Sequence, residues 1–599
     1  MSAGKGKKIV RAFIATIFAL ALGIVVGLGS LIERPGALIA RSGSTGTNNE
    51  AGFVRFVEVA EQAGVVAPNV WGGIDRKKFI IETKGNGVGF LDYDRDGWLD
   101  VYLTNGTRLE GFSSGQKPTN HLYHNNHDGT FTDVTLRSGL ARTDWQTGIC
   151  VGDYDNDGWD DLLLTYWGQN RLFHNNGDGT FADVTARAGL TQTKVRWGTG
   201  CTFLDYDRDG FLDIFIANYL EFDPQLAPAP GDAPYCAWKG MPVLCGPRGL
   251  PNGRNVLYHN NRNGTFTDVS VPSGIAKTTD KGLGAVSYDF DNDGWPDIYV
   301  ANDSTPSQLY HNNHDGTFTE IAARAGVAFN EDGFEQGGMG LAVADYDGDG
   351  WFDIFKTNFA DDVPNLYHNN RNGTFTDLAT TAGVGAITNL VSWGAGFVDV
   401  DNDGWRDLLY VSGHVYPEVD EYSLNSSYRQ PRLLYRNLGN GRFQNISSQA
   451  GPAFKERYSS RGCAFGDFNN DGKVDVLIMN MNDEPSLWRN DSQNSNSSVL
   501  VKLIGTHSNR SAIGARVRVV TGKHVQMDEV HSGDSVMSMS DLRLRFGLGR
   551  AEKIDLLEVW WPTTGLVEQF HDVGVNQVIY VQEGSGIIRT EKLAAAHAK

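Results

Sequence analysis

The sequence is short of positive charge, of cysteine and of recognisable catalytic motifs. Its 599 residues include 52 lysines and arginines against 72 aspartates and glutamates, so the formal net charge is −20. A chain this acidic is a poor partner for nucleic acid, and we expect no nucleic-acid binding. The five cysteines show no zinc-ligand spacing, and neither a phosphate-binding loop nor a nucleophile with its base stands out. The sequence therefore gives no positive indication of an enzyme.

Much of the acidic charge lies in one nine-residue pattern, D-x-[DN]-x-D-G-x-x-D, which occurs seven times. Aspartates at positions 1, 3 and 5 converge on a tightly curved chain, and the glycine at position 6 permits the turn. The carbonyl of position 7 and the aspartate at position 9 can complete a shell of oxygen ligands, which suits Ca²⁺ better than Mg²⁺. A single copy would be compatible with an ordinary acidic turn. Seven copies indicate up to seven Ca²⁺ sites.

Five positions of each loop are proposed metal ligands. Through the seven loops in order, they are Asp92, Asp94, Asp96, Trp98 and Asp100; Asp153, Asp155, Asp157, Trp159 and Asp161; Asp205, Asp207, Asp209, Phe211 and Asp213; Asp289, Asp291, Asp293, Trp295 and Asp297; Asp345, Asp347, Asp349, Trp351 and Asp353; Asp399, Asp401, Asp403, Trp405 and Asp407; and Asp467, Asn469, Asp471, Lys473 and Asp475. Asn469 at position 3 and Lys473 at position 7 depart from the pattern, so we expect the weakest site in the seventh loop.

The acidic loops alternate with a second motif, such as LYHNNHDGTFTDVT from Leu122. Its Asp-Gly or Asn-Gly pair between short apolar runs predicts a hairpin of two outer strands. Most loops are also preceded by a strand of small residues such as Gly198 and Gly200, as is needed where strands crowd a central axis. Four strands per repeat are typical of a propeller blade. We therefore predict an all-β fold with a seven-bladed, calcium-binding β-propeller over residues 53–490.

The two ends of the repeat region complement each other. The last repeat lacks its final strand, and Phe56 to Val59 supply a matching one, which closes the ring. Residues 491–498 read as a linker. Residues 499–584 show period-two alternation in about seven strands, which predicts a second, small β-sandwich domain. Residues 585–599 are expected to form a loose tail.

The N-terminus carries the one long apolar run. Lys5, Lys7, Lys8 and Arg11 precede an uncharged stretch over residues 12–32, long enough as a helix to span a bilayer. We expect a transmembrane signal-anchor over residues 1–32, with a cleaved signal peptide as the alternative, and a flexible tether over residues 33–52. Either way the rest of the chain lies outside the cytoplasm, periplasmic or at the cell surface, as a membrane-anchored or secreted protein.

Two repeats carry long insertions, at residues 219–255 and 412–431. Both follow the second strand of a blade, so both should emerge on one face. Cys236 and Cys245 lie nine positions apart in the first insertion, and we predict a disulfide between them. Tyr235, Trp238 and Arg248 on the same loop are residue types that dominate binding sites.

Other residues recur on the inner and outer strands of the repeats. Cys150, Cys201 and Cys463 precede acidic loops, and we expect them to be buried apolar residues in separate blades. Equivalent positions of different blades lie far apart, so we assign the recurring histidines a structural role. They are His124, His174, His259, His311 and His368. The tryptophans at loop position 7 are expected to pack between blades.

Two sets of motifs resemble known families. The acidic repeats resemble the FG-GAP or VCBS repeats of integrin α-subunit propellers. The segments SNRSAIGARVRVV from Ser508, HSGDSVMSMSDLRLRFGLG from His531 and LEVWWP from Leu557 look like the ASPIC/UnbV domain. The pairing resembles the cartilage acidic protein family. The resemblance implies a calcium-binding propeller with an extracytoplasmic or surface role, and it implies no established catalytic activity.

Two classes of function remain open. The first is a binding, adhesion or scaffold module that takes a protein or glycan ligand on a propeller face. The alternative is an enzyme acting on a glycan or a secondary metabolite, with its site among the insertions and the C-terminal domain. His414, Glu418 and Asp420 are the candidates for acid–base chemistry there. Convergence of these three side chains in one pocket with the first insertion would favour the enzyme.

Overall fold

The structure is a computed structural model that describes residues 54–112 and 117–594. All of these belong to one unit of the chain, Glu50–Lys599. The expected signal-anchor over residues 1–32 and the tether over residues 33–52 lie outside the described residues. Within the described ranges, no helix has the length and apolar character that crossing a membrane requires.

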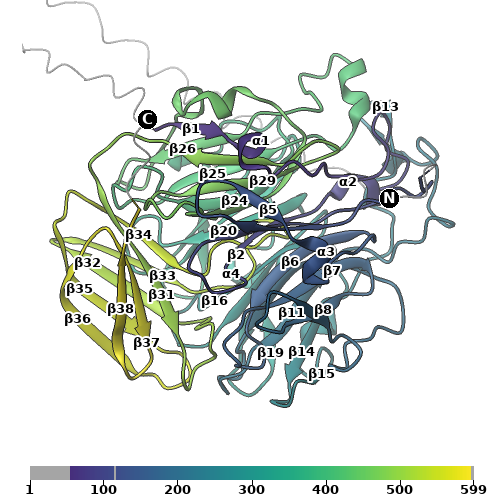
Figure 1. Cartoon of the computed structure of the whole chain (residues 1–599). Helices are drawn as coiled ribbons and strands as arrows, with labels where there is room; N and C mark the ends of the chain where they lie inside the picture. The colour runs from purple at the N-terminus through teal and green to yellow at the C-terminus, as the bar shows by residue number, and fades with distance from the viewer. Residues whose placement is uncertain (1–53, 113–116, 595–599) are drawn as a thin grey trace, which may run out of the picture. The chain divides into compact units, whose positions relative to one another are not determined.

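The described strands up to residue 490 form seven four-stranded antiparallel sheets, the blades of a β-propeller (Figure 1). In each blade the strand that opens the repeat is innermost, and an acidic loop joins it to the second strand. Blades two and three are further joined by a short pairing of Trp197 with Trp167. The seven repeats of the sequence therefore correspond to seven blades.

The strand positions are the same in every blade. The inner strands are β2 (Val88–Leu91), β6 (Gln146–Gly152), β10 (Arg196–Leu204), β16 (Gly282–Tyr288), β20 (Gly338–Ala344), β24 (Ser392–Val398) and β28 (Ser460–Gly466). The second strands are β3 (Asp100–Leu103), β7 (Asp161–Gly168), β11 (Asp213–Asn218), β17 (Asp297–Asn302), β21 (Asp353–Asn358), β25 (Asp407–Ser412) and β29 (Asp475–Asn480). The third strands are β4 (His121–Asn125), β8 (Arg171–Asn175), β14 (Val256–Asn260), β18 (Gln308–Asn312), β22 (Asn365–Asn369), β26 (Leu433–Asn437) and β30 (Ser486–Asn490). The outer strands are β5 (Phe131–Asp133), β9 (Phe181–Asp183), β15 (Phe266–Asp268), β19 (Phe318–Glu320), β23 (Phe375–Asp377), β27 (Phe443–Asn445) and β1 (Phe56–Glu58).

The ring closes between the last blade and the first. Strand β1 pairs antiparallel with β30, with Phe56 opposite Asn490, and so completes the seventh blade. Successive inner strands contact one another around the ring, and β28 contacts β2. This confirms that the strand at Phe56 closes the propeller.

One buried asparagine per blade fastens that blade to the preceding one. Its side-chain nitrogen donates to the backbone carbonyl of loop position 2 in the preceding blade, at 2.8–2.9 Å. Asn125 makes this bond to Phe468 across the closure of the ring. The seven asparagines are Asn125, Asn175, Asn260, Asn312, Asn369, Asn437 and Asn490. Each acidic loop is thus tied directly to the next blade.

Short helical turns and one small hairpin connect the strands. The α-helical turns are α1 (Ala60–Ala63), α2 (Ile81–Lys84), α3 (Thr135–Ser138), α4 (Ala322–Ala325) and α5 (Ala379–Ala382). The 3₁₀ turns are η1 (Pro234–Cys236), η2 (Ile275–Lys277), η3 (Pro417–Glu421), η4 (Ser447–Gln449) and η5 (Pro452–Lys455). The first insertion also forms a hairpin of β12 (Ala237–Trp238) and β13 (Met241–Pro242).

The C-terminal domain consists of two four-stranded sheets, in the orders β34–β31–β37–β38 and β33–β32–β35–β36. Val501, Val519 and Leu557 from the two sheets share one buried cluster, so the sheets pack face to face as a sandwich. The strands are β31 (Ser497–Ile504), β32 (Arg516–Thr521), β33 (His524–Glu529), β34 (Leu544–Gly549), β35 (Lys553–Trp560), β36 (Val567–Gly574), β37 (Gln577–Gln582) and β38 (Gly586–Lys592). The prediction of a loose tail over residues 585–599 is wrong at β38, which is an ordered strand. Its mostly exposed side chains lack apolar alternation, so the sequence does not indicate the strand.

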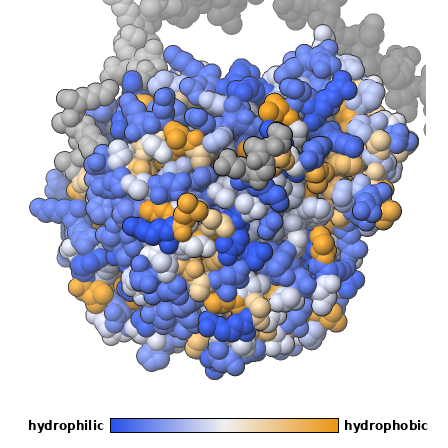
Figure 2. Space-filling view, turned by 45° about the vertical axis from the view of Figure 1, so that its right-hand side comes forward, coloured by the Kyte–Doolittle hydropathy of each residue, from blue (hydrophilic) through white to orange (hydrophobic). Residues whose placement is uncertain are grey.

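The surface carries few apolar clusters on the face shown in Figure 2. Hydrophilic residues predominate there, and apolar residues lie in small separate groups. Individual exposed side chains such as Leu136 and Leu226 are of the scattered kind that soluble surfaces normally show.

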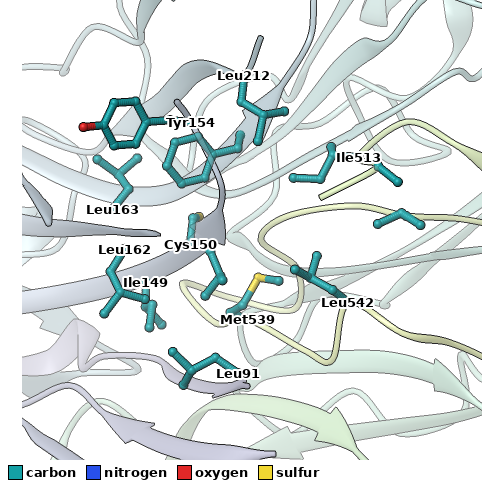
Figure 3. Close-up of a cluster of buried hydrophobic side chains, with 14 of the residues drawn as sticks. Leu91, Ile149, Cys150, Tyr154, Leu162, Leu163, Leu212, Ile513, Met539 and Leu542 are labelled. Carbon is teal, nitrogen blue, oxygen red and sulfur yellow. The ribbon is translucent and has the colours of Figure 1, made fainter. Parts of the chain in front are cut away.

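A loop of the C-terminal domain, residues 531–542, enters the propeller among its inner strands; we call it the plug loop. The carbonyl of Met537 accepts a hydrogen bond from Ile149 N at 3.3 Å, and that of Ser535 accepts one from Leu341 N at 2.7 Å. Figure 3 shows Met539 and Leu542 of the plug loop among buried side chains of the first blades. The two domains therefore share one core.

Glycines in or directly before the inner strands make room for the plug loop. A Cβ atom at Gly87 would lie 1.7 Å from the Met537 carbonyl oxygen, and one at Gly462 would lie 2.4 Å from Ser538 Oγ. The small residues that the sequence attributes to crowded strands therefore also accommodate a segment from outside the propeller.

The cysteines correct one expectation and confirm another. Cys236 and Cys245 form the predicted disulfide. Cys150 and Cys201 also form a disulfide, between β6 and β10, so the expectation of isolated apolar residues is wrong for these two. Neighbouring inner strands bring their Cα atoms to 6.1 Å, which allows the bond. Cys463 is buried and free, and burial raises the pKa of its thiol far above the usual range.

Candidate metal centres and ligand cavity

Position 1 of each acidic loop fastens the backbone of the loop. In the third loop the Asp205 carboxylate accepts hydrogen bonds from Asp209 N at 2.9 Å and from Gly210 N at 3.0 Å. Gly210 has a φ of +88°, which glycine adopts without strain. The bond from position 6 to position 1 recurs in all seven loops. Position 1 therefore shapes the loop as well as adding charge to it.

Positions 3 and 9 meet the recurring histidine in the first five blades. The histidine Nδ1 lies 3.3–3.4 Å from a position 3 oxygen and 3.2–3.4 Å from a position 9 oxygen. Position 9 opens the second strand and the histidine stands on the third, so strand pairing brings the two together. Equivalent histidines lie in different blades, as expected, but each lies beside the loop of its own blade. The sequence analysis compared the histidines only with one another, and so it missed the acidic loop beside each of them.

These groups fit a divalent cation. In several loops, carboxylate oxygens and the imidazole nitrogen lie within 4.8 Å of one another. One buried oxygen of the position 3 aspartate has no hydrogen-bond partner among the described residues in six loops, at Asp94, Asp155, Asp207, Asp291, Asp347 and Asp401. Of these six, Asp401 alone has an arginine in its own blade beside that oxygen, since Arg436 forms an ion pair with it at 2.9 Å. A buried carboxylate oxygen without a partner costs free energy, and a bound cation would provide the partner.

Burial makes the charged loops costly without a counterion. It raises the pKa of the position 9 aspartates Asp100, Asp161, Asp297 and Asp353 to about 7, although the adjacent imidazole opposes the shift. Conversely, the Asp100 carboxylate raises the pKa of His124. Several carboxylates at close range repel one another, which favours either protonation of one of them or the binding of a cation. Cation binding in these loops would therefore be coupled to folding.

Positions 5 and 7 lie toward the outside of the loops. Asp96 accepts a hydrogen bond from Trp98 N at 2.8 Å and pairs with His127 at 2.6 Å. The Trp98 ring stacks on His127, and Arg95 of the first loop lies over Trp159 of the second. The Trp159 and Trp295 rings thus pack against an arginine of the preceding loop, as expected, whereas the Trp98 ring stacks on a histidine of its own blade. That the position 7 carbonyl faces an ion stays a prediction.

The last two blades have arginine in place of the histidine, at Arg436 and Arg489. Arg436 lies 2.9 Å from the position 3 carboxylate of Asp401. In the seventh loop Lys473 pairs with Asp471 at 3.3 Å. The seven loops are therefore not chemically equivalent.

Arginines of the C-terminal domain contact the acidic loops. Arg516 pairs with Asp289, at position 1 of the fourth loop, at 2.6 Å. Arg545 donates to the backbone carbonyl of Asp399, at position 1 of the sixth loop, at 2.8 Å. The loops therefore form part of the contact between the two domains, and their net charge affects that contact.

A cavity of about 400 Å³ lies where the two insertions meet. Acidic loops and insertions follow successive strands of antiparallel blades, so they lie at opposite ends of the propeller. Tyr235, Trp238 and Arg248 of the first insertion line the cavity, with Val415 and Tyr416 of the second. This confirms that both insertions emerge on one face.

A buried ion pair forms part of the cavity wall. Lys84 Nζ lies 2.5 Å from Asp303, which also accepts a hydrogen bond from the Tyr219 hydroxyl at 2.6 Å. Burial alone would raise the pKa of Asp303, but Lys84 outweighs it and holds that pKa below its ordinary value. Aromatic walls with a few fixed polar groups are typical of ligand pockets.

The three acid–base candidates do not converge. His414 is buried beside Trp238, with ring centroids 4.7 Å apart, and burial lowers its pKa to about 3. Asp420 is exposed and accepts a hydrogen bond from Tyr428 N. Among the described residues that line the cavity, neither of these nor Glu418 appears. The geometry expected for the enzyme alternative is not present in the described part of the chain.

Known protein families match both parts of this architecture. Residues 92–164, 153–216, 243–300, 289–355 and 420–478 match the FG-GAP-like repeat family, and these ranges hold all the acidic loops but the sixth. Residues 505–588 match the ASPIC and UnbV family, and this range holds the plug loop. The chain is an FG-GAP repeat protein with an ASPIC and UnbV domain.

Individual proteins that resemble this FG-GAP repeat protein share only a low sequence identity with it. It is 26% identical to cartilage acidic protein 1 of Homo sapiens over 312 residues, 50% of this chain and 44% of that protein. It is 27% identical to the Xenopus tropicalis protein over 311 residues, again 50% and 44%. The match thus spans less than half the length of these relatives. A solved Agrocybe aegerita lectin, described as recognising terminal N-acetylglucosamine, has 17% identity and a TM-score of 0.34, covering 66% of this chain and 88% of its own. A superposition this loose supports no conclusion about ligands.

Proposed function

We propose that this protein is an extracytoplasmic, cation-dependent binding module. Cations in the acidic loops, Ca²⁺ being the ion that the oxygen ligands suggest, would hold the blades and the C-terminal domain together. The cavity at the opposite end would take a protein or glycan ligand. The single observation that carries the proposal is this cavity, in which two separate insertions place side chains around one space.

The composition of the cavity supports recognition rather than catalysis. Trp238 and Tyr235 provide flat apolar surface, while Arg248 and Asp362 provide charged hydrogen-bonding groups. Tryptophan, tyrosine and arginine contribute most of the binding energy at recognition sites. The Cys236–Cys245 disulfide constrains the loop that carries these residues, which lowers the entropy lost on binding.

The extracytoplasmic location is supported by the cysteines. Four of the five form disulfides, which persist in oxidising compartments. The membrane as a partner rests on the apolar run over residues 12–32 alone.

A binding screen tests this function. The full-length chain in excess Ca²⁺ is applied to a glycan array and to an array of extracellular proteins, together with Trp238→Ala and Tyr422→Ala. Tyr422 lies on the second insertion but does not line the cavity, so it is the matched control. We expect Trp238→Ala to weaken binding by about tenfold or more, and Tyr422→Ala to leave it unchanged. Equal binding by Trp238→Ala and the unmodified chain would contradict the proposal.

A further inference from the structure

We propose that the acidic loops of the first five blades bind a divalent cation with the blade histidine as a ligand, and that the sixth and seventh loops bind none. This rests on the proposed function only in taking the loops as cation sites. It changes the expected stoichiometry from seven ions to five, and the expected ligand set from oxygen alone to oxygen with one nitrogen.

The histidine nitrogens lie at the spacing expected of a second ligand on one ion. Nδ1 has no hydrogen-bond partner among the described residues at His124, His174 and His368, whereas at His259 it lies 3.4 Å from the Tyr206 hydroxyl. Nδ1 of His368 lies 3.4 Å from Asp347 and 3.2 Å from Asp353, and it has no hydrogen-bond partner among the described residues. Two ligands at right angles on one ion, each about 2.1–2.4 Å from it, lie about 3.0–3.4 Å apart. The same spacing recurs at His124, His174, His259 and His311.

Buried oxygens in the same loops also require a positively charged partner. The Asp353 side chain is 0% exposed, yet its Oδ2 has no hydrogen-bond partner in the described structure. Oδ1 of Asp347 in the same loop is likewise buried and unpartnered. His368 Nδ1 lies beside the other oxygen of each of these carboxylates, Asp347 Oδ2 and Asp353 Oδ1, so the three side chains meet in a single loop. A cation there would satisfy all three groups at once.

The sixth blade provides its own positive charge at this point. Arg436 occupies the position of the histidine, and its guanidinium lies 2.9 Å from Asp401 and 3.3 Å from Asp403. A planar guanidinium is always charged and well suited to carboxylates. Because it pairs with the position 3 carboxylate that the ion would need, the guanidinium takes the place of the ion in the sixth loop.

The seventh blade lacks both key groups. Position 3 is Asn469, a neutral amide whose oxygen accepts a hydrogen bond from Asp471 N at 3.2 Å. Lys473 places an ammonium 3.3 Å from Asp471, and Arg489 in the histidine position pairs with Asp491. This loop therefore has one carboxylate fewer, no imidazole and an internal cation.

The ligand set bears on which ion binds. Ca²⁺ prefers six to eight oxygen ligands, carboxylates also suit Mn²⁺, and imidazole nitrogen suits transition-metal ions such as Zn²⁺. Carboxylates with one imidazole therefore admit Mn²⁺ as well as Ca²⁺. Both are divalent cations of the class proposed, and parallel experiments with each ion distinguish them.

The test is the number of ions bound per chain. The full-length protein is stripped of metal, equilibrated with Ca²⁺ or Mn²⁺, freed of unbound ion and measured by elemental mass spectrometry. We expect five ions per chain for the tighter-binding ion, six in Arg436→His, and four in His368→Ala. Arg442→His, on an exposed part of the same hairpin as Arg436, should remain at five.

Several results would overturn the proposal. These are six or seven ions in the unmodified chain, five in Arg436→His with a normal unfolding curve, or five in His368→Ala. If Arg436→His does not fold, His124→Ala and His368→Ala still test the imidazole, each expected to remove one ion. Absence of any bound ion would also remove cation dependence from the proposed function. Loss of ligand binding at the cavity with five ions retained would contradict only the proposed function.

Discussion

At the scale of single residues, the propeller ring is held together by a buried asparagine that occurs once in each blade. The buried asparagine of each third strand donates to the preceding blade, and its own carbonyl oxygen accepts from the hairpin that follows, as at Asn312 with His314 N. The neighbouring asparagine, such as Asn313, bonds only within its exposed hairpin. Two adjacent and identical residues thus differ in whether they link blades.

The pair Asn312 and Asn313 tests that difference. Asn312→Ala leaves the buried Tyr206 carbonyl without its 2.8 Å donor, and should lower the free energy of unfolding by about 1–3 kcal/mol. Asn313→Ala should change it by less than about 0.5 kcal/mol, because its bond is exposed. Urea unfolding of both variants measures the effect. Equal losses would contradict the cross-blade role.

A second residue-scale feature is a single carboxylate that organises the C-terminal domain. Glu583 accepts hydrogen bonds from three successive backbone N–H groups, of Thr506, His507 and Ser508, at 2.7–2.9 Å. Burial would raise its pKa, but these donors outweigh burial and lower the pKa from 4.5 to about 2.

This carboxylate predicts a defined dependence of stability on acid. Because the folded pKa lies below the unfolded one, the stabilisation is present above pH 4.5 and is lost as the pH falls toward about 2. Glu583→Gln should lose about 2 kcal/mol at neutral pH and show a weaker decline through that acid range. Thermal unfolding between pH 2 and 7 measures this. Parallel curves for variant and unmodified chain would show that the interaction contributes nothing.

At the scale of elements, the plug loop joins the two domains through the inner strands. Gly87 lies so close to the Met537 carbonyl that any side chain must displace the backbone. Gly246 has its nearest neighbour at 3.6 Å, so a methyl group fits there without displacement.

The plug contact predicts different effects for these two glycines. Gly87→Ala should destabilise the protein by about 1–3 kcal/mol, as overpacking does, and should increase hydrogen exchange in residues 531–542. Gly246→Ala should leave the exchange of that loop unchanged. Unaltered exchange of the plug loop in Gly87→Ala would contradict the contact.

Some of these structural elements could be predicted from the sequence alone and others could not. Blades and ring closure follow from it because each repeat carries its own loop and hairpin signals, and the missing strand is visible at Phe56. The plug loop does not, because its small polar residues carry no periodic signal and their partners lie in other blades. The Cys150–Cys201 disulfide depends on the spacing of inner strands, which no local pattern encodes. The difference between the histidine-containing sites and the other two loops could be predicted in part, because the sequence has arginine in place of histidine in the sixth and seventh repeats.

At the scale of the whole molecule, the acidic loops connect three features: blade packing, domain contact and net charge. They lie between blades fastened by asparagines, and they face arginines of the C-terminal domain such as Arg516 and Arg545. Without cations, several buried carboxylates of each loop would repel one another at neutral pH. Cation binding to the folded chain alone stabilises it by mass action. The ions should therefore act on the stability of the propeller and the C-terminal domain together.

The most direct test of this account is thermal unfolding of the full-length chain in excess chelator and after return of Ca²⁺ or Mn²⁺. We predict a clearly lower unfolding temperature in chelator and full recovery with the ion that binds. Asp207→Ala, which removes one site, should lower the temperature by a fraction of the chelator effect. The same unfolding temperature with and without chelator would contradict the central claim that cations in these loops hold the folded protein together.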